Sequence, residues 1–297
     1  MSKKRPDEGV EKIRRRVEAI IKVRPSYREV LELFKDVATE QYLMRSKIKT
    51  APVEIEKENL AARMREGFPL VEKQALTLDI PSVTRLFKRL CKLLSHHKKA
   101  SADCEQITHA LNNKKIDLLE LFKQIDLDNK EYITDLSKKI GVKDGVLEFV
   151  ARNSLRPIFE AYAENLKDSV DQEIWWRGYC PICGSGPFLA EFKNEGARFL
   201  LCSSCGYEWR FMRLKCPFCE NDDHERLGYF YTEKEEKTYR VDVCEKCERY
   251  IKTVDIRDQG EDIIPVIEDV GTFHLDILAQ KAGYKRETAA SGLQVHA

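Results

Sequence analysis

Residues 180–205 read CPICGSGPFLAEFKNEGARFLLCSSC, and residues 216–247 read CPFCENDDHERLGYFYTEKEEKTYRVDVCEKC. Each stretch opens with the form Cys-Pro-apolar-Cys and closes with a second Cys-x-x-Cys pair, after a spacer of 18 residues in the first and 24 in the second. The spacers predict β-hairpins over 188–201 and 227–243. Two tandem copies of one small β module are the economical interpretation.

The cysteine pairs have the spacing of metal ligands. Two cysteines separated by two residues can direct both sulfur atoms at one ion, and two such turns complete a tetrahedron of thiolates. This ligation suits both zinc and mononuclear iron, and it leaves no open position for Lewis-acid catalysis. The repeat favours pairing in chain order over a cross-brace of the two modules. The predicted ligands are Cys180, Cys183, Cys202 and Cys205 at the first site and Cys216, Cys219, Cys244 and Cys247 at the second.

The residues that follow the second cysteine of each pair differ between the modules. The first module has Gly184 and Gly206 there, and glycine permits the positive φ with which backbone N–H groups point at the sulfur atoms. The second module has Glu220 and Glu248. We therefore expect the second site to have a less regular turn and to be more exposed.

Two other uses of the cysteine pairs are weaker interpretations. A thioredoxin-type redox pair occurs once within a βαβ pattern, whereas this chain has four pairs in one stretch. A nucleic-acid-binding module needs a basic face, but residues 175–258 contain 14 Lys and Arg against 15 Asp and Glu. The short basic strip of Arg210, Arg213 and Lys215 is more simply explained as charge compensation for the thiolate centres.

The composition is that of a globular protein with a mixed-charge surface. The 297 residues are 42% hydrophobic and carry a formal net charge of +1, which gives no bulk attraction to nucleic acid or to an anionic membrane. No apolar segment follows the basic N-terminus and no run of 18 apolar residues occurs, so we expect no membrane insertion and a cytoplasmic location. Common enzyme motifs are missing, which favours a protein that is not an enzyme and has no catalytic residues.

The first half of the chain has the apolar periodicity of helices. Ser26 and Glu29 have the pattern of a capping box, and Pro157 should break or kink the last helix near Arg156. The predicted fold class is therefore α+β and multidomain. The predicted domains are residues 1–172 (helical), 173–214 (first four-cysteine module), 215–258 (second four-cysteine module) and 259–297 (C-terminal helix and tail).

A few isolated residues have a structural interpretation. Cys91 and Cys104 lie alone in the helical half and are expected to be small buried apolar side chains. Trp175, Trp176 and Trp209 lie in or next to the first module, where a place in its core or at a domain interface is the simplest expectation. A contact of Trp209 with a partner protein is the alternative.

Several motifs of the second half resemble those of the formate dehydrogenase accessory protein FdhE family. The order of the motifs and the Glu-Trp that follows the second cysteine pair carry the resemblance, which covers about residues 175–286. The matching stretches are RGYCPICGS (177–185), LCSSCGYEW (201–209), RLKCPFC (213–219), YRVDVCEKCERYIK (239–252), Asp269, LDILA (275–279) and GYKR (283–286).

The resemblance implies a cytoplasmic factor needed for the assembly or activity of formate dehydrogenase, with the catalytic subunit of that enzyme as its partner. It implies a helical N-terminal domain followed by two rubredoxin-like modules that hold iron, one ion per four-cysteine site and two in total, with zinc as the alternative metal. A rubredoxin-like one-electron carrier and a zinc-ribbon nucleic-acid-binding protein are the alternative functions.

Overall fold

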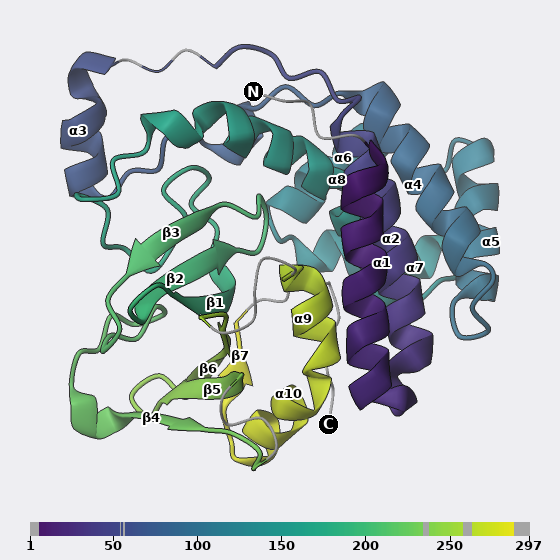
Figure 1. The fold of residues 1–297 in the computed structure, drawn as a ribbon. Coiled ribbons are helices and arrows are strands. Elements are labelled where there is room, and N and C mark those ends of the chain that lie inside the picture. Colours follow the sequence, from purple (N-terminus) through teal and green to yellow (C-terminus); the bar gives the residue numbers. More distant parts are fainter. Residues whose placement is uncertain (1–5, 54, 56, 234–237, 258–262, 288–297) are drawn as a thin grey trace. The chain divides into compact units, whose positions relative to one another are not determined.

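The computed structural model describes residues 6–53, 55, 57–233, 238–257 and 263–287, and it divides into two compact units (Figure 1). The first unit is helical. The second contains the short helix α3 (Lys57–Glu66), a β-sheet and two C-terminal helices. The predicted fold class, a helical N-terminal region followed by β modules with two four-cysteine clusters, is confirmed. Among the described residues, no helix combines the length and the apolar character needed to cross a membrane.

The first unit is built from helices joined by short turns. Gly141 ends one of them with a left-handed φ of 74°, as its position after a helical pattern suggests. The helices are α1 (Pro6–Val23), α2 (Arg28–Arg45), α4 (Ile80–Leu94), α5 (Ser101–Asn112), α6 (Leu118–Asp126), α7 (Lys130–Ile140) and α8 (Asp144–Leu166), of which residues up to 161 belong to this unit.

The apolar face of α4 lies in the core of the first unit. Phe87 of α4 meets Phe122 of α6 edge to face, with ring centroids 6.1 Å apart. Phe34 of α2 meets Phe149 of α8 in the same way. Cys91 is buried here as expected, and so is Cys104 of α5. The buried residues of α4 are Ser82, Val83, Leu86, Phe87, Leu90, Cys91 and Leu94.

Helix α8 continues through Pro157, so the predicted break near Arg156 is wrong. A proline has no N–H and leaves the carbonyl group four residues earlier without its helical partner. The side-chain amide of Gln41 supplies that partner, since its Nε2 donates to the Asn153 oxygen at 2.8 Å. Both side chains are buried, at 6% and 2% exposure. A tertiary contact therefore offsets the local defect.

The predicted capping box at Ser26 is also wrong. Residues Pro25–Tyr27 form a short 3-10 turn that runs directly into α2, and no side chain caps either helix start. Pro25 fixes its own φ and favours the first turn of a helix, so the chain enters helical geometry before Ser26 can act as a cap.

The second unit is built on one mixed sheet in the order β3-β2-β1-β6-β5-β4, with β7 paired to β6. Both predicted hairpins form: β1 pairs with β2, and β4 pairs with β5, in each case antiparallel. The two modules join through a parallel pairing of β1 with β6, in which Leu189 lies opposite Lys252. The strands are β1 (Pro187–Lys193), β2 (Ala197–Cys202), β3 (Glu208–Phe211), β4 (Leu227–Phe230), β5 (Tyr239–Cys244), β6 (Arg249–Asp255) and β7 (Lys285–Arg286).

Two helices follow the sheet where one was predicted. They are α9 (Pro265–Gly271) and α10 (Phe273–Lys281), with Thr272 between them. Leu275 and Ala279 of α10 are fully buried in a cluster with apolar residues of the sheet, among them Val241 and Val254. The helices thus cover one face of the sheet.

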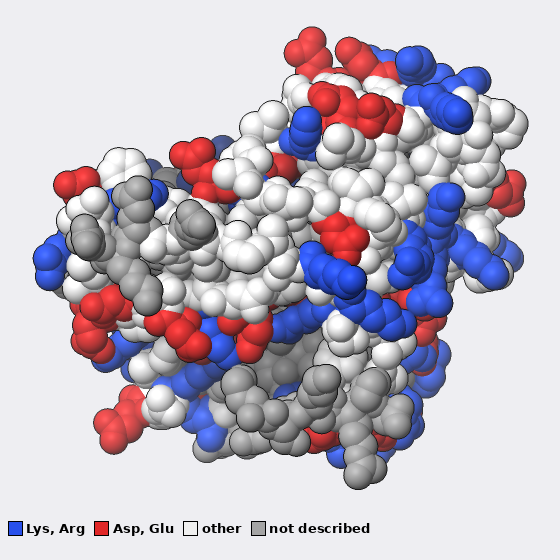
Figure 2. Space-filling model, turned by 90° about the horizontal axis from the view of Figure 1, so that it is seen from above, with Lys and Arg blue, Asp and Glu red and all other residues white. Residues whose placement is uncertain are grey.

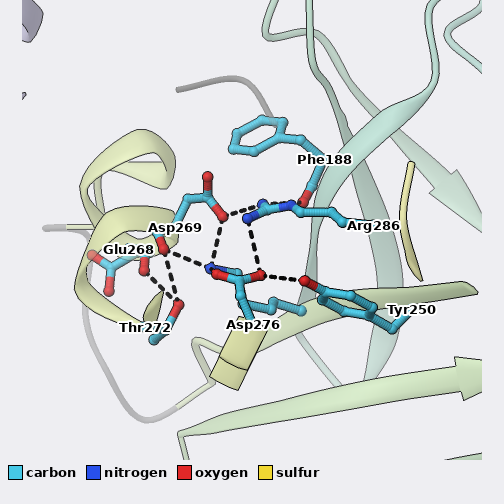
Figure 3. A network of polar contacts seen from close by, with 8 residues as sticks. Phe188, Tyr250, Glu268, Asp269, Thr272, Asp276 and Arg286 are labelled. Carbon is cyan, nitrogen blue, oxygen red and sulfur yellow. Dashed lines mark hydrogen bonds and ion pairs between the residues drawn. The ribbon is translucent and has the colours of Figure 1, made fainter. Parts of the chain in front are cut away.

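A network of buried charges lies beneath these helices (Figure 3). The Lys252 ammonium of β6 lies 2.9 Å from Asp269 of α9 and 2.7 Å from Asp276 of α10. Arg286 of β7 contacts both carboxylates, and the Tyr250 hydroxyl donates to Asp276 at 2.8 Å. The two carboxylates are 1% exposed and the Lys252 side chain 2%. Two cations balance two anions inside the unit.

The balance fixes the ionisation of these groups. Burial alone would raise the pKa of Asp269, but the neighbouring Arg286 and Lys252 charges outweigh it and hold that pKa below its ordinary value. Burial, followed by the Asp276 carboxylate, raises the pKa of Tyr250, so this residue stays a hydrogen-bond donor.

Replacing the buried ammonium should destabilise the second unit strongly. Lys252→Met leaves two buried carboxylates facing one guanidinium, and breaking a buried charge pair in this way costs about 3–5 kcal/mol. Lys281→Met is the matched control, because Lys281 ends α10 on an exposed position and should change stability by less than about 0.5 kcal/mol. Urea unfolding followed by tryptophan fluorescence measures both. Equal midpoints for the two variants would contradict a structural role for the network.

Candidate metal centres

The first cysteine cluster lies at the end of the sheet where β1 begins and β2 ends. Cys180 and Cys183 occupy the turn before β1, Cys202 ends β2, and Cys205 follows in the next turn. The antiparallel register places Pro187 opposite Cys202 and so brings the two turns together. The Sγ atoms of Cys183 and Cys202 are 3.4 Å apart, and that of Cys205 lies 3.6 Å from both Cys180 and Cys183.

The second cluster repeats this arrangement in the second module. Cys216 and Cys219 precede β4, Cys244 ends β5, and Cys247 lies in the turn before β6. Leu227 lies opposite Cys244 in the β4–β5 register. Sulfur atoms are 3.7 Å apart for Cys216 and Cys247, and again for Cys219 and Cys244. The cysteines therefore group in chain order, and a cross-brace is excluded.

The sulfur geometry fits a tetrahedral ion. The ligand atoms of each cluster all lie within 4.8 Å of one another. A tetrahedron with metal–sulfur bonds of about 2.3 Å has edges of about 3.8 Å. The shortest sulfur separations, 3.4–3.7 Å, are close to that edge. Each cluster can thus accept one ion with little movement of the backbone.

The turns of the two modules have the same backbone conformation. Gly184 and Gly206 have φ of 73° and 66°, and Glu220 and Glu248 both have φ of 56°. The expected irregularity of the second site is therefore wrong, because the N–H groups need this geometry whichever residue supplies it. The expected greater exposure is confirmed: all four cysteines of the first site are buried, whereas Cys219 and Cys247 are half-buried.

Backbone N–H groups donate to the sulfur atoms. Ser204 and Cys205 both donate to the Cys202 Sγ at 3.4 Å, and Phe218 donates to the Cys216 Sγ at 3.4 Å. Such bonds favour the thiolate over the thiol. They therefore favour the charge state that a metal requires.

The thiols of each cluster differ in acidity. Burial raises the pKa of Cys180. The pKa of Cys183 lies below its ordinary value, because the other three cysteines of the cluster form hydrogen bonds with its sulfur atom. Burial raises the pKa of Cys247 to about 11. A metal ion displaces the protons that the neutral thiols retain, so metal affinity should rise with pH.

Two indole rings hold the segment that leads into the first cluster. Trp175 Nε1 donates to the Tyr179 oxygen at 2.9 Å, and Trp209 Nε1 donates to the Arg177 oxygen at 3.0 Å. Both rings are fully buried. The core interpretation of these tryptophans is confirmed, and a partner contact through Trp209 is excluded because no ring surface is accessible.

A segment from the first half of the sequence also supports the first cluster, and sequence analysis missed it. The N–H groups of Leu70 and Val71 donate to Pro181 and Ile182, at 2.8 and 3.0 Å. Residues 53–72 belong to the second unit together with α3. The domain boundary at residue 172 stays a prediction, because compact packing does not test whether a segment folds independently.

The two modules meet at Gly178. A side chain there would place its Cβ 1.7 Å from the backbone oxygen of Pro217. The segment leading into the first cluster therefore lies directly against the first turn of the second cluster. Only glycine permits this approach.

The basic strip between the modules does not act as one surface. Lys215 pairs with Glu220 at 3.2 Å, Arg210 lies over the Trp176 ring, and Arg213 lies over the Phe192 ring. Basic and acidic side chains both occur across the face of the molecule in Figure 2. Among the residues that the structure describes, only Lys215 of the three pairs with a carboxylate, while Arg210 and Arg213 stack on aromatic rings, so the three side chains do not form the continuous basic face that nucleic-acid binding needs.

Comparisons with known proteins agree with this arrangement. The FdhE central domain model matches residues 179–213, and the FdhE C-terminal domain model matches residues 214–293. A protein FdhE homolog of Aquifex aeolicus is 28% identical over 264 residues, which are 88% of this chain and 87% of that protein. Protein FdhE of Escherichia coli K12 is 30% identical over 115 residues, 38% of this chain and 36% of that protein.

The fold also matches that of a solved structure. The crystal structure of the FdhE protein from Pseudomonas aeruginosa superposes with a TM-score of 0.64 and 20% identity, covering 93% of each chain. The likeness therefore extends to the helical unit, which neither domain model covers. The matched domains, the relative aligned along most of its length and the shared fold together support the FdhE family for this chain.

Proposed function

We propose that each cysteine cluster binds one metal ion, with iron as the first candidate and zinc as the alternative. The sulfur geometry supports this proposal, because both clusters approximate a tetrahedron of thiolates. Four sulfur ligands close the coordination shell, so the centres are suited to structure or electron transfer and not to activation of a bound water. The proposed ligands are Cys180, Cys183, Cys202 and Cys205, and Cys216, Cys219, Cys244 and Cys247.

We further propose that the protein is a non-enzymatic accessory factor of formate dehydrogenase, which acts on the catalytic subunit in the cytoplasm. The observation that carries this proposal is the pair of closed four-cysteine clusters within one sheet in a chain of the FdhE family. When bound, the metals close the two modules. The sheet and its turns would then present a preformed surface to the client.

One observation favours a second candidate, a one-electron carrier. Cys219 and Cys247 of the second centre are half-buried, whereas the first centre is enclosed. An exposed sulfur edge shortens the path for an electron to a partner. A centre holding iron would show a thiolate-to-iron absorption band that bleaches reversibly with dithionite, and a colourless zinc protein that supports full formate dehydrogenase activity would eliminate this function.

Each cluster should contribute one equivalent of metal independently of the other. We expect two equivalents of metal in protein purified without oxygen, and one equivalent in both Cys183→Ala and Cys219→Ala, because a three-sulfur site binds far more weakly. Cys91→Ala removes a buried cysteine outside the clusters and should keep two equivalents. Elemental analysis gives the count. Unchanged metal in the first two variants would refute the assignment of ligands.

The left-handed turn of the second centre offers a test of its strain. Glu248 has a φ of 56°, a conformation that raises the energy of a residue with a side chain by about 1 kcal/mol. Glu248→Gly should therefore slow metal loss to a chelator by a few-fold. Its exposed contact with Lys285 is worth little.

Glu245→Gly is the control for this strain, because Glu245 lies in the same turn but outside the positive-φ residues. Glycine there only adds backbone freedom, so metal loss should become faster. The same effect for both variants would show that the turn is not strained.

The accessory role predicts a requirement for the clusters in cells. Expression of this chain in a strain lacking its own accessory factor should restore formate dehydrogenase activity, and affinity purification should recover the catalytic subunit. The Cys183→Ala/Cys219→Ala double variant should restore little activity, and Cys91→Ala should restore it fully. No association with a catalytic subunit, together with normal formate dehydrogenase activity in the deletion strain, would refute the role.

A further inference from the structure

The face of the sheet opposite α9 and α10 carries arginines and aromatic rings. Side chains alternate between the faces of a strand, so Tyr239 and Val241 of β5 point toward the helices while Arg240 points away. Residues opposite each other in register share a face. Phe192 pairs with Arg198, and both lie on the same side as Arg240.

Two adjoining cavities open on this face. Their volumes are about 200 and 190 Å³, and they share Arg213, Tyr229 and Arg240 as lining residues. Arg198 lines the first cavity and Phe192 the second. Residues of both modules contribute, so the cavities exist only because β1 and β6 join the modules. Their size suits a small group better than a drug-sized molecule.

Arg198 lines the first cavity, and its guanidinium has more N–H donors than there are acceptors around it. Its side chain is 4% exposed, and its NH1 donates to the Lys215 oxygen at 3.1 Å. The Asp242 carboxylate lies 3.6 Å from NH2, beyond a hydrogen bond. The Nε and NH2 groups are buried with no hydrogen-bond partner, and the same holds for the Nε of Arg240. Unpaired buried donors of a charged group are costly, and an acceptor in the cavity would satisfy them.

The donors of the cavity indicate which acceptor fits. Asp242 is paired with Arg240 at 2.8 Å. Cys216 and Cys244 of the second centre also line the first cavity, so the arginines compensate carboxylate and thiolate charge there. Three N–H groups of Arg198 and Arg240 are nevertheless without a hydrogen-bond partner, and Arg213 forms no ion pair with a carboxylate in the described ranges. A phosphate monoester offers three strong acceptor oxygens to these groups, and a carboxylate offers two.

Aromatic rings hold the guanidinium groups in place. Arg240 lies between Phe192 and Tyr229, 4.4 and 4.6 Å from the two ring centroids. Arg213 lies 4.9 Å from the Phe192 centroid. Stacking of this kind leaves the in-plane N–H groups of arginine free to bind an oxyanion. Tyr229 is 60% exposed and stacks with Tyr231, so a planar group next to the phosphate would meet a ring.

We propose that this cavity between the two cysteine modules binds the phosphate group of a small molecule, through Arg198, Arg213 and Arg240. The ligand is free phosphate or a phosphorylated compound with a planar part that contacts Tyr229. The first cavity borders the second metal centre, because Cys216 and Cys244 are among its lining residues.

Calorimetric titration of the full-length, metal-replete protein at constant ionic strength tests the site with two probes, inorganic phosphate and phenyl phosphate. We expect saturation at one site per chain. Tighter binding of phenyl phosphate assigns a phosphorylated aromatic compound, and equal binding assigns free phosphate. Acetate, with two acceptor oxygens instead of three, should bind more weakly than either.

Variants separate the cavity from general electrostatics. Arg213→Gln should weaken phosphate binding about tenfold, because it removes a charge-assisted contact from an exposed side chain that the fold does not need. Arg198→Met should weaken it at least as much at unchanged metal content. Arg226→Gln is the matched control, since Arg226 is exposed in the same unit and outside the cavities, and it should bind as the wild type does.

Three results would overturn the proposal. The first is a dissociation constant weaker than about 1 mM for both phosphate probes. The second is an equal loss of affinity in Arg213→Gln and Arg226→Gln. The third is a single-stranded oligonucleotide that binds more tightly than phenyl phosphate through Arg213, which would make the ligand a nucleic acid.

Discussion

The parallel pairing of β1 with β6 is the contact on which the second unit depends. Each cysteine module has three short strands and cannot bury much apolar surface by itself. Joined where Leu189 lies opposite Lys252, the two modules form one sheet with two usable faces. One face packs against α9 and α10, and the other forms the arginine-lined cavities. The metal clusters lie where the strands of the two hairpins start and end, so all three features share one framework.

The buried charges fix the position of α9 and α10 over this sheet. Lys252 comes from β6, Asp269 from α9, Asp276 from α10 and Arg286 from β7, so the network ties four elements together. Apolar side chains alone would tolerate several positions of the helices over the sheet. Four charges at hydrogen-bond distance allow a single position of the helices, because any shift leaves a charge unpaired in a medium of low polarity. The network therefore selects the position of α9 and α10 more than it adds to stability.

Much of the molecule could be predicted from the sequence, and the failures have physical causes. Cysteine spacing identified both clusters, and the spacers between the cysteine pairs identified both hairpins, because each signal is local. The β1–β6 pairing and the Lys252 network could not be predicted, since they join residues whose partners are far away in the chain. At Pro157 the local rule was correct but a distant amide, Gln41, supplied the missing hydrogen bond. At Glu220 and Glu248 the geometry of the turn prevailed over residue preference.

The long separation of the joined strands has a consequence for synthesis on the ribosome. The first hairpin is complete many residues before β6 emerges, and until then β1 is an unpaired edge strand. Unpaired edge strands can pair with strands of other chains. Early capture of an ion by the first four cysteines would lock this hairpin and protect it while it waits. The order of the modules along the chain thus favours the yield of correctly folded protein, because the enclosed centre comes first and the more exposed centre completes the sheet.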